Sequence, residues 1–290
     1  MRLEMVYFWL TIQTLIASLT HIIAKAVVKE ISPLALTLLR SGIAGVGFWF
    51  IIHFSKYRRI RVESADRLRF FMLGILAVPL NQFAFIFGIK YTTPANASLI
   101  YAMTPIFALI FSAMFLKEKI NFYKVLGVML SFVGIGIVFA EHGISLNFEY
   151  LKGNIVIMFG AMFWALYSVL GKPMIIKYGA LYVTGVAMII GSLAYLPFGL
   201  YDFIVLDFNS ISFASWLGVI YLGVGTSIFG YFLWYYAIGK IEASKVVIFT
   251  NGQPIMTAIL GMIIFGNPIT LPFLIGGTLV VIGVFLVQLG

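Results

Sequence analysis

Long apolar runs alternate with short polar breaks along the whole chain. A helix needs about 20 mostly apolar residues to cross a bilayer. Ten stretches reach that length: residues 5–25, 33–54, 68–90, 94–116, 122–140, 153–172, 179–201, 213–237, 243–265 and 271–289. The breaks between them are too short to hold a separate soluble domain. The pattern therefore predicts an all-α integral membrane protein with ten transmembrane helices.

The two halves of the chain repeat this pattern. Sliding the sequence by 149 positions places Pro105 on Pro254 and Gly127 on Gly276 without a gap. Each half holds five spans, an odd number, so the second half must be inverted relative to the first. We expect two inverted five-helix repeats, residues 1–149 and 150–290, in one membrane domain. Inverted repeats are typical of transporters, although gene duplication also builds static bundles.

Composition agrees with a membrane protein. Hydrophobic residues make up 62% of the 290 residues and charged residues only 10%, and a soluble core cannot use so much apolar surface. The scarcity of charge argues against a disordered chain. The sequence has no Cys, which excludes a disulfide framework, thiolate catalysis and a Cys-ligated metal. We expect no cofactor and no metal site.

The net charge of +9 indicates orientation rather than nucleic-acid binding. Lys and Arg are enriched on the cytoplasmic side of membranes, and with ten spans both termini share a side. Four basic residues fall on the opposite side, Lys25, Lys29, Lys90 and Lys152, and Arg40 lies within a span. The other 14 fall on the side of the termini: Arg2, Lys56, Arg58, Arg59, Arg61, Arg67, Arg69, Lys117, Lys119, Lys124, Lys172, Lys177, Lys240 and Lys245. We expect a multi-pass protein of the cell inner membrane with cytoplasmic termini and no nucleic-acid partner.

Several short motifs resemble one known family. The string FLKEKI at residues 115–120 is followed by LGV at 126–128 and GIG at 134–136. Together they are similar to the fourth and fifth spans of EamA-type members of the drug/metabolite transporter superfamily. Arg40 matches the family's second-span Arg, and Pro105 and Pro254 match its prolines in spans four and nine. The resemblance implies ten spans in two repeats and export of amino acids, other small metabolites or drugs, with uptake in some members.

Two positions depart from the family pattern. Ile16-Ala17 stands where the family often has Trp-Gly, and Gly266-Asn267 stands where its second repeat usually has Gly-Glu. Because only the first repeat keeps the Glu, at Glu118, we expect that residue to cap a loop rather than to drive transport.

Polar side chains follow one face of the first span. At 100° per residue, Gln13, Ser18 and His21 fall on the same side of the helix. A polar face in hydrocarbon must contact protein or water. We expect these residues to line a substrate cavity. The alternative is contact with neighbouring helices, where Ser and Thr often bond to backbone carbonyls.

Seven further residues complete the candidate substrate site. The adjacent amides of Asn81 and Gln82 lie deep in the third span, where they need polar partners. Prolines in the fourth and ninth spans free a backbone carbonyl, which points to nearby Tyr101 and Gln253. Aromatic rings in the sixth and eighth spans either stack on a flat or apolar substrate or fill the core. The candidates are Gln13, Ser18, His21, Asn81, Gln82, Tyr101, Trp164, Tyr167, Trp234 and Gln253.

Two ionisable residues stand out within the spans. No Asp or Glu falls in the middle of a predicted span, so His21 is the best-placed proton carrier because histidine titrates near neutral pH. A neutral, hydrogen-bonded His21 is the alternative, and facilitated diffusion or exchange stays open. Arg40 needs an acceptor, which can be a set of helix C-terminal carbonyls, Glu30 or an anionic substrate. Because the resembling family has an Arg here across varied substrates, a structural role is our first expectation.

Together with these features, the resemblance to the EamA family implies a secondary transporter that exports amino acids or similar small metabolites by alternating access. Its central cavity would be lined by spans one, three, four, six, eight and nine. An integral-membrane lipid-modifying enzyme and a non-transporting helical bundle are the alternatives. The sequence has no His-rich cluster, paired mid-span carboxylates or nucleophile with a base, so we expect no enzyme. Glycines at seven-residue spacing in spans five and ten permit close packing within the monomer, and a homodimer through the same glycines is the alternative.

Overall fold

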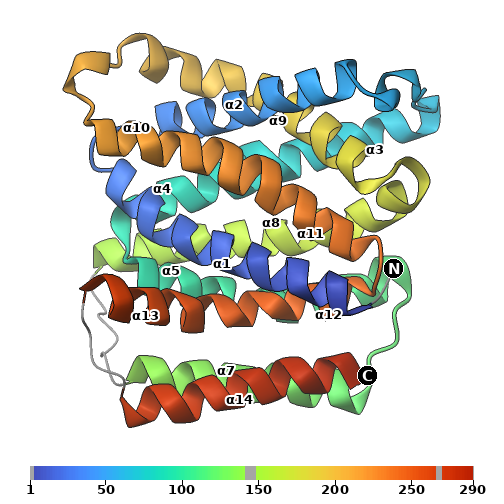
Figure 1. Ribbon diagram of the computed structural model, residues 1–290, viewed down its shortest axis with the longest axis vertical. Coiled ribbons are helices and arrows are strands. Elements are labelled where there is room, and N and C mark those ends of the chain that lie inside the picture. Colours follow the sequence, from blue (N-terminus) through green and yellow to red (C-terminus); the bar gives the residue numbers. More distant parts are fainter. Residues whose placement is uncertain (1–2, 141–147, 266–269, 290) are drawn as a thin grey trace.

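The computed structural model describes residues 3–140, 148–265 and 270–289, and every element in this part is helical (Figure 1). Arg2 and Gly266-Asn267 lie outside the described residues. The first half contains α1 (Leu3–Val27), α2 (Pro33–His53), η1 (Lys56–Arg59), α3 (Ser64–Ile75), η2 (Leu76–Gln82), α4 (Phe83–Tyr91), α5 (Pro94–Tyr101), α6 (Thr104–Phe111), η3 (Ser112–Leu116) and α7 (Phe122–Ala140). The second half contains α8 (Phe148–Tyr178), α9 (Ala180–Ile204), η4 (Phe208–Ser210), α10 (Phe213–Ile220), η5 (Tyr221–Gly230), α11 (Tyr231–Ile238), α12 (Ala243–Val247), η6 (Ile248–Asn251), α13 (Gly252–Phe265) and α14 (Leu271–Leu289).

Seven helical segments of the described chain are long and apolar enough to cross a membrane. They are Leu3–Val27, Pro33–His53, Ser64–Tyr91, Pro94–Leu116, Leu151–Tyr178, Ala180–Ile204 and Phe213–Ile238. The apolar helices α7 (Phe122–Ala140) and α14 (Leu271–Leu289) have 19 residues each, and the predicted ninth span is divided into α12, η6 and α13. The helical membrane class agrees with the sequence, and seven of the ten predicted spans correspond to these segments.

Local sequence signals set the start of several helices. Ser32 accepts a hydrogen bond from the N–H of Ala35 at 3.2 Å, and Pro33 occupies the first turn of α2. Thr93 and Pro94 play the same two roles at the start of α5. A side-chain oxygen before a helix satisfies one of its free N–H groups, and Pro is preorganised for the first turn. Short polar connections therefore end one helix and begin the next.

Irregular turns interrupt three of the helical segments, and polar side chains lie at or directly after these turns. Pro79 lies inside η2, a π-helical turn. Proline lacks an N–H and its ring clashes with the carbonyl four residues earlier, so the chain adopts a wider turn. Asn81 and Gln82 end this turn, Tyr231 follows the π-helical η5, and Gln253 follows the 3₁₀ turn η6. The irregular backbone thus presents polar groups toward the interior.

A break in the fourth predicted span positions Tyr101. Pro105 has no N–H to bond with the carbonyl of Tyr101, which lies four residues earlier. The hydroxyl of Thr104 donates to that carbonyl instead. The chain ends α5 at Tyr101 and begins α6 at Thr104. The proline predicted to free a backbone carbonyl therefore does so, and the neighbouring hydroxyl satisfies it.

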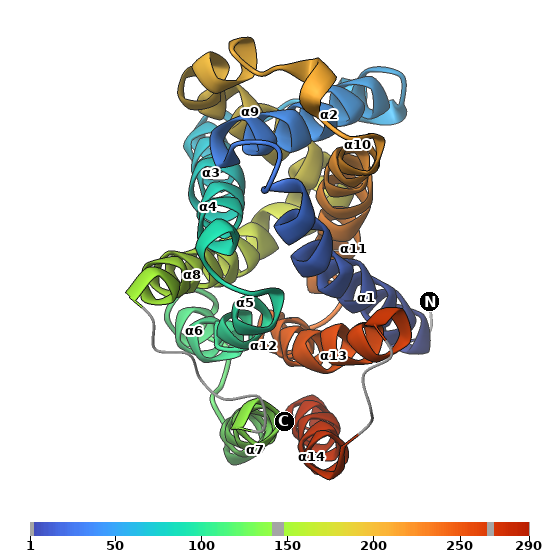
Figure 2. The ribbon, with the colours of Figure 1, turned by 90° about the vertical axis from the view of Figure 1, so that its left-hand side faces the viewer.

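The helices surround a central region, as the end-on view in Figure 2 shows. Helices α1, α3–α4, α5, α8, α10–α11 and α13 form the ring. Helix α2 packs against α9 at one edge, and α7 packs against α14 at the opposite edge. The ring helices therefore provide the walls of any central site.

Glycines allow α7 and α14 to approach closely. A Cβ added at Gly127 would meet the carbonyl oxygen of Gly283, and one at Gly134 would meet that of Gly276. Small residues at such positions let two helix backbones pack at short range. The packing predicted within the monomer is confirmed.

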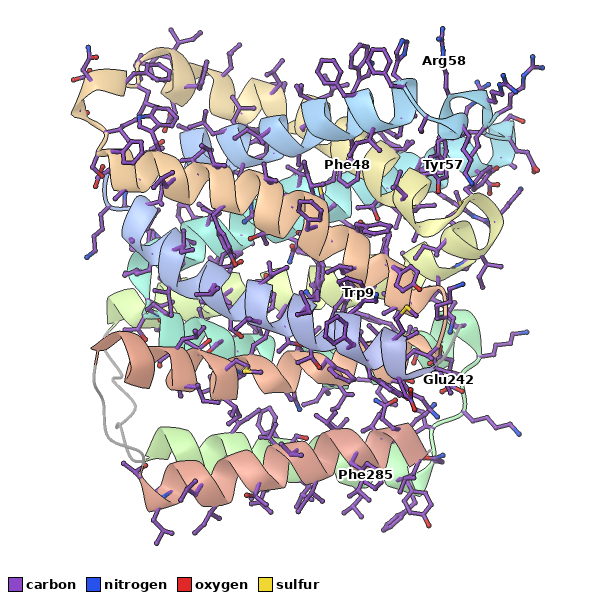
Figure 3. All side chains as sticks on the ribbon, viewed as in Figure 1. Trp9, Phe48, Tyr57, Arg58, Glu242 and Phe285 are labelled. Carbon is purple, nitrogen blue, oxygen red and sulfur yellow. The ribbon has the colours of Figure 1, made fainter. Side chains whose placement is uncertain are left out.

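Large apolar side chains cover the outside of the bundle. Phe285 on α14 is 61% exposed and points away from the other helices, whereas Phe48 on α2 is 1% exposed (Figure 3). Water does not solvate such a surface favourably, but lipid does. The outer faces are therefore those of a protein in a bilayer.

Candidate functional site

A cavity lies at the centre of the helical ring. The volume accessible to water inside it is about 60 Å³. Its walls are Gln13, Ile16, Ala17, Thr20, His21, Arg40, Asn81, Gln82, Phe85, Tyr101, Trp164, Thr226, Gly230, Tyr231 and Gln253. Amide, hydroxyl, imidazole and guanidinium groups share this wall with aromatic rings. Such a lining suits a small solute that has both polar and apolar parts.

The cavity gathers seven of the ten candidate residues, all ten of which are described. The seven are Gln13, His21, Asn81, Gln82, Tyr101, Trp164 and Gln253. They come from α1, η2, α5, α8 and α13, and Thr226 and Tyr231 add η5 and α11. The cavity wall thus includes the six predicted spans, and Arg40 of α2 is an addition to them.

Three candidates lie outside the cavity lining. Ser18 is fully buried and donates to Thr14 O at 2.7 Å and Gln253 O at 3.3 Å. Trp234 is fully buried and donates through Nε1 to Ser168 Oγ at 2.8 Å. Tyr167 is also fully buried. Helix contacts, which were the alternative for Ser18, account for its position.

Asn81 joins four helical segments. Its Nδ2 donates to Tyr101 Oη and to the carbonyl of Gly160, both at 2.9 Å. Its Oδ1 accepts from Tyr231 Oη at 2.8 Å. The amide therefore uses three hydrogen bonds to tie η2 to α5, α8 and α11. Such a satisfied buried network fixes the geometry of the cavity wall.

His21 lies between α13 and two aromatic rings. Its Nε2 is 3.1 Å from Gln253 Oε1, and its ring meets the edges of Phe85 and Tyr101 at centroid distances of 5.2 and 5.7 Å. An amide oxygen only accepts, so Nε2 carries a proton in this arrangement. Nδ1 has no hydrogen-bond partner within the described chain, which leaves one ring nitrogen for another group.

Arg40 brings a positive charge to the cavity. The side chain is 2% exposed, and its Nε donates to Ser227 Oγ at 3.2 Å. Gln82 Nε2 donates to the same hydroxyl at 3.3 Å. Within the described ranges, Arg40 forms no ion pair. Glu30, one acceptor proposed from sequence, binds the N–H and hydroxyl of Ser212 instead.

Several aromatic rings pack around Trp164. The Trp164 ring meets Tyr231 edge-on at a centroid distance of 4.7 Å and lies 5.2 Å from Trp234. Tyr167 and Tyr235 stack at 4.4 Å, and the Tyr235 hydroxyl donates to Tyr167 O at 2.8 Å. Trp164 is the member of this cluster from α8 that reaches the cavity. Tyr231 of α11 also lines the cavity, whereas Tyr167, Trp234 and Tyr235 support these rings and fill the core.

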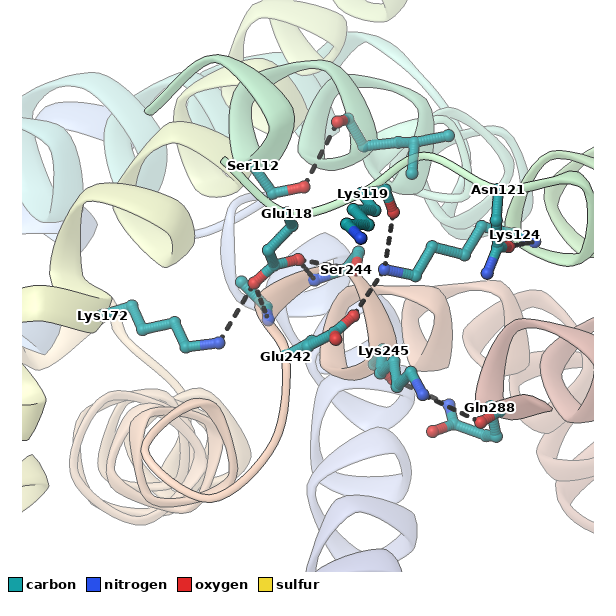
Figure 4. Close-up of polar contacts among 12 residues, drawn as sticks. Ser112, Glu118, Lys119, Asn121, Lys124, Lys172, Glu242, Ser244, Lys245 and Gln288 are labelled. Atoms are coloured by element: carbon teal, nitrogen blue, oxygen red, sulfur yellow. Dashed lines mark hydrogen bonds and ion pairs between the residues drawn. The ribbon is translucent and has the colours of Figure 1, made fainter. Parts of the chain in front are cut away.

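Glu118 joins three segments at one end of the bundle (Figure 4). One carboxylate oxygen accepts from Lys172 Nζ at 3.0 Å and from Ala243 N at 2.9 Å. The other accepts from Ser244 Oγ at 2.8 Å and Ser244 N at 3.3 Å. Burial raises the pKa of Glu118, but the bonds from Ser244, Ala243 and Lys172 outweigh it and hold the pKa below its ordinary value. Glu118 caps the N-terminus of α12, where a negative charge is favourable, rather than the loop in which it lies.

Further polar contacts extend this end network. Lys124 is 1% exposed and pairs with Glu242, and its Nζ donates to Lys119 O at 3.1 Å. Lys245 and Gln288 exchange two hydrogen bonds at 3.0 and 2.9 Å (Figure 4). The contacts connect α12 to the start of α7 and the end of α14. They hold the segments at this end of the bundle together.

Lys25 joins α1 to α4 at the opposite end. Its Nζ donates to the carbonyls of Ile89 and Lys90, both at 3.0 Å. Both carbonyls belong to the last turn of α4, where a cation is favourable. Lys25 thus binds backbone carbonyls at this end, whereas Lys172 binds the carboxylate of Glu118 at the other.

Sequence reasoning missed several members of the cavity wall. Thr20 lies seven residues after Gln13 and thus on the same face of α1, a signal that was available. Thr226 and Tyr231 are five residues apart, which places them on one face only because the chain between them forms a π-helical turn. A search that assumes 100° per residue throughout does not place Thr226 and Tyr231 on the same face.

Comparisons with known proteins agree with this architecture. The model of the EamA-like transporter family matches residues 4–140 and again residues 151–289. An uncharacterized transporter of Archaeoglobus fulgidus is 33% identical over 266 residues, which cover 91% of each chain. The uncharacterized transporter YyaM of Bacillus subtilis is 28% identical over 281 residues, 96% of this chain and 92% of that one.

A solved crystal structure has the same fold. It superposes with a TM-score of 0.78 and covers 99% of this chain and 97% of its own at 19% identity. At that identity the likeness concerns the fold alone. The two family matches together cover nearly the whole chain, and this chain therefore belongs to the EamA-like transporter family.

Proposed function

We propose that this protein is a secondary transporter that exports amino acids or similar small metabolites across the cell inner membrane. The observation that carries the proposal is the central cavity, in which polar and aromatic side chains from seven helical segments converge. A static bundle has no need to gather so many polar groups around a central cavity. The substrate would bind in this cavity through the candidate residues that line it.

Alternating access would follow from two inverted five-helix repeats, residues 1–149 and 150–290. The family model matches once in each half. Helix α2 packs against its counterpart α9, and α7 packs against its counterpart α14, as expected for elements beside a pseudo-two-fold axis. The glycine contacts are reciprocal, since Gly127 faces Gly283 and Gly134 faces Gly276. These relationships support ten spans around a shared central site.

The polar contacts at the two ends suggest how access would alternate. The Glu118 network ties α12 to α8 at one end, and Lys25 ties α1 to α4 at the other. Opening either end requires its contacts to break while those at the opposite end persist. Each set is small enough to be exchanged for water during a transport cycle.

The distribution of basic residues supports cytoplasmic termini. The start of α1, the end of α14 and the 56–69 segment lie at the same end of the bundle (Figure 1), where Arg58 and Glu242 are also found (Figure 3). Because the sequence has no Cys, single cysteines report the side directly. We expect S210C to react with an impermeant maleimide on intact cells and S64C to react only after permeabilisation. The reverse labelling would refute the orientation.

Transport is tested with the purified protein in liposomes. Radiolabelled amino acids and nucleosides would be measured in both directions, with and without a pH gradient. We expect flux above that of empty vesicles, a loss of flux in Trp164→Ala, and normal flux in Lys29→Gln, which changes an exposed residue outside the cavity. Failure of every solute to cross would count against transport. Flux that ignores the pH gradient would remove His21 from a coupling role.

A further inference from the structure

Arg40 is a buried cation without a counter-ion in the described part of the chain. Its side chain is 2% exposed and lines the cavity. The described carboxylates that form ion pairs are Glu63, Asp66, Glu118 and Glu242, and each pairs with Lys or another Arg. Burial of an unpaired charge is costly because the low-dielectric interior does not solvate it. The site is therefore electrostatically incomplete.

The other acceptors proposed for Arg40 are engaged elsewhere. Glu30 accepts two hydrogen bonds from Ser212, at 2.8 Å from its N–H and 2.9 Å from its hydroxyl. The bond from Arg40 Nε goes to the neutral hydroxyl of Ser227, which itself donates to Leu222 O at 2.9 Å. Among the described residues, no hydrogen bond leads from either terminal guanidinium nitrogen to a backbone carbonyl. A set of helix C-terminal carbonyls does not neutralise this charge.

A buried guanidinium without a counter-ion has a defined binding chemistry. Its planar fork matches the two oxygens of a carboxylate, and the charged hydrogen bonds strengthen away from water. The same cavity has the rings of Phe85, Tyr101 and Trp164 in its wall. We propose that Arg40 binds the carboxylate of a small amphipathic ligand whose apolar part contacts these rings. The inference rests on the proposed function, because the ligand would be the transported solute.

This assignment changes the expectation drawn from sequence. An Arg that only braces neighbouring helices would have its donors satisfied by the protein. Here one of the three guanidinium nitrogens is bonded within the described chain, and a ligand can satisfy the remaining two. Substrates without an anionic group would leave the charge uncompensated. The cavity therefore selects for carboxylates over amines and alcohols of the same size.

The first experiment uses the wild-type protein and three ligands that differ only at one end. Binding of 3-phenylpropanoate, 3-phenylpropan-1-ol and 2-phenylethylamine would be measured by calorimetry in lipid nanodiscs. We expect the carboxylate to bind at least about tenfold more tightly than the alcohol, a factor equal to ~1.4 kcal/mol, and the amine to bind more weakly still. Equal binding of the alcohol, or no binding of the carboxylate, would overturn the proposal. Preferential binding of phenyl phosphate would overturn the choice of carboxylate.

The second experiment uses variants of Arg40. Arg40→Gln should weaken 3-phenylpropanoate binding by at least about tenfold and leave binding of the alcohol unchanged, whereas Arg40→Lys should retain part of the preference. Lys29→Gln removes one exposed cation outside the cavity and should bind as the wild type does. Undiminished carboxylate binding by Arg40→Gln would contradict the proposal.

The two proposals fail in different ways. Carboxylate binding without flux of any solute in liposomes would refute transport and keep the role of Arg40. Flux of amines or neutral solutes without carboxylate binding would keep transport and refute the role of Arg40. If Arg40→Gln does not fold, the comparison of the three ligands on the wild-type protein still decides the question.

Discussion

Glu118 accepts a hydrogen bond from the backbone N–H of Ala243 at 2.9 Å, although 125 residues separate them in the chain. The carboxylate belongs to the link between η3 and α7, and the N–H belongs to the first residue of α12. A residue from the first half of the chain thus caps a helix of the second half. Lys172 of α8 binds the same carboxylate at 3.0 Å, so one side chain holds three segments together.

Replacing Glu118 by Gln should destabilise the protein. In the Gln side chain only the oxygen accepts hydrogen bonds, whereas the NH₂ group is a donor and would face an N–H group of α12. Lys172 also loses its counter-ion. We expect a loss of about 1–2 kcal/mol, measured by thermal unfolding in detergent. Glu63→Gln is the control because Glu63 is an exposed member of a surface pair with Lys177, and its loss should matter by less than about 0.5 kcal/mol. Equal effects of the two variants would argue against the cap.

The contribution of Glu118 should depend on pH. Its pKa in the folded protein lies below the ordinary value of 4.5, so the unfolded chain takes up a proton first as the pH falls. The stabilisation is fully present above pH 4.5 and is lost as the pH falls through the folded pKa. The difference in melting temperature between wild type and Glu118→Gln should therefore be constant near pH 7 and shrink below pH 4.5. A difference that grows on acidification would show the opposite sign of the pKa shift.

Asn81 should be among the residues most sensitive to truncation. Asn81→Ala removes three hydrogen bonds at once and leaves Gly160 O and two tyrosine hydroxyls without their partner. We expect a loss of about 2–3 kcal/mol, against about 1 kcal/mol for Tyr231→Phe, which removes one of these bonds. Chemical unfolding in mixed micelles compares the two variants. A milder effect of Asn81→Ala would mean that other groups or water replace the network.

Two glycines of α7 should respond in opposite ways to the same change. A Cβ at Gly134 would meet the carbonyl of Gly276, so Gly134→Ala should push α7 from α14 and cost about 1–3 kcal/mol. A Cβ at Gly136 meets nothing within 4 Å, and Gly136→Ala should stabilise the helix by about 0.5–1 kcal/mol. Thermal unfolding of both variants measures the contrast. Similar values for both would place α7 and α14 farther apart.

Gln13 should favour ligands that carry an ammonium group beside the carboxylate. Its Oε1 has no hydrogen-bond partner among the described residues, and an unpaired buried acceptor gains most from a charged donor. Phenylalanine should therefore bind more tightly than 3-phenylpropanoate, and Gln13→Leu should remove that advantage. Thr11→Val, on the exposed side of α1, is the matched control in the same calorimetric titration. An unchanged advantage in Gln13→Leu would exclude this contact.

The fold was largely predictable because its main determinants are local. Apolar runs of bilayer length indicated helices, and Pro105, which was expected to free a backbone carbonyl, lies where one of them is interrupted. The glycine spacing indicated close packing of α7 and α14, and Gly127 does lie against Gly283. The division of residues 243–265 into α12, η6 and α13 was not predicted, because hydropathy reports burial and not the type of helical turn.

The site was predictable in part. Polar residues on one face of α1 were expected to share an environment, and Gln13 and His21 do line the cavity. Ser18 was placed there by the same argument but bonds to backbone carbonyls instead. A helical face specifies a direction to within a wide arc, whereas a hydrogen bond requires a partner about 3 Å away. Sequence periodicity does not resolve that difference.

By itself the sequence determined the helical membrane class of the protein, because hydrophobic length and spacing act within each helix. Only the tertiary structure decided that Arg40 has no counter-ion in the described chain and that Glu118 caps α12. Charge pairing and capping depend on distances of a few ångströms between segments far apart in the sequence. Those distances exist only once the helices have packed.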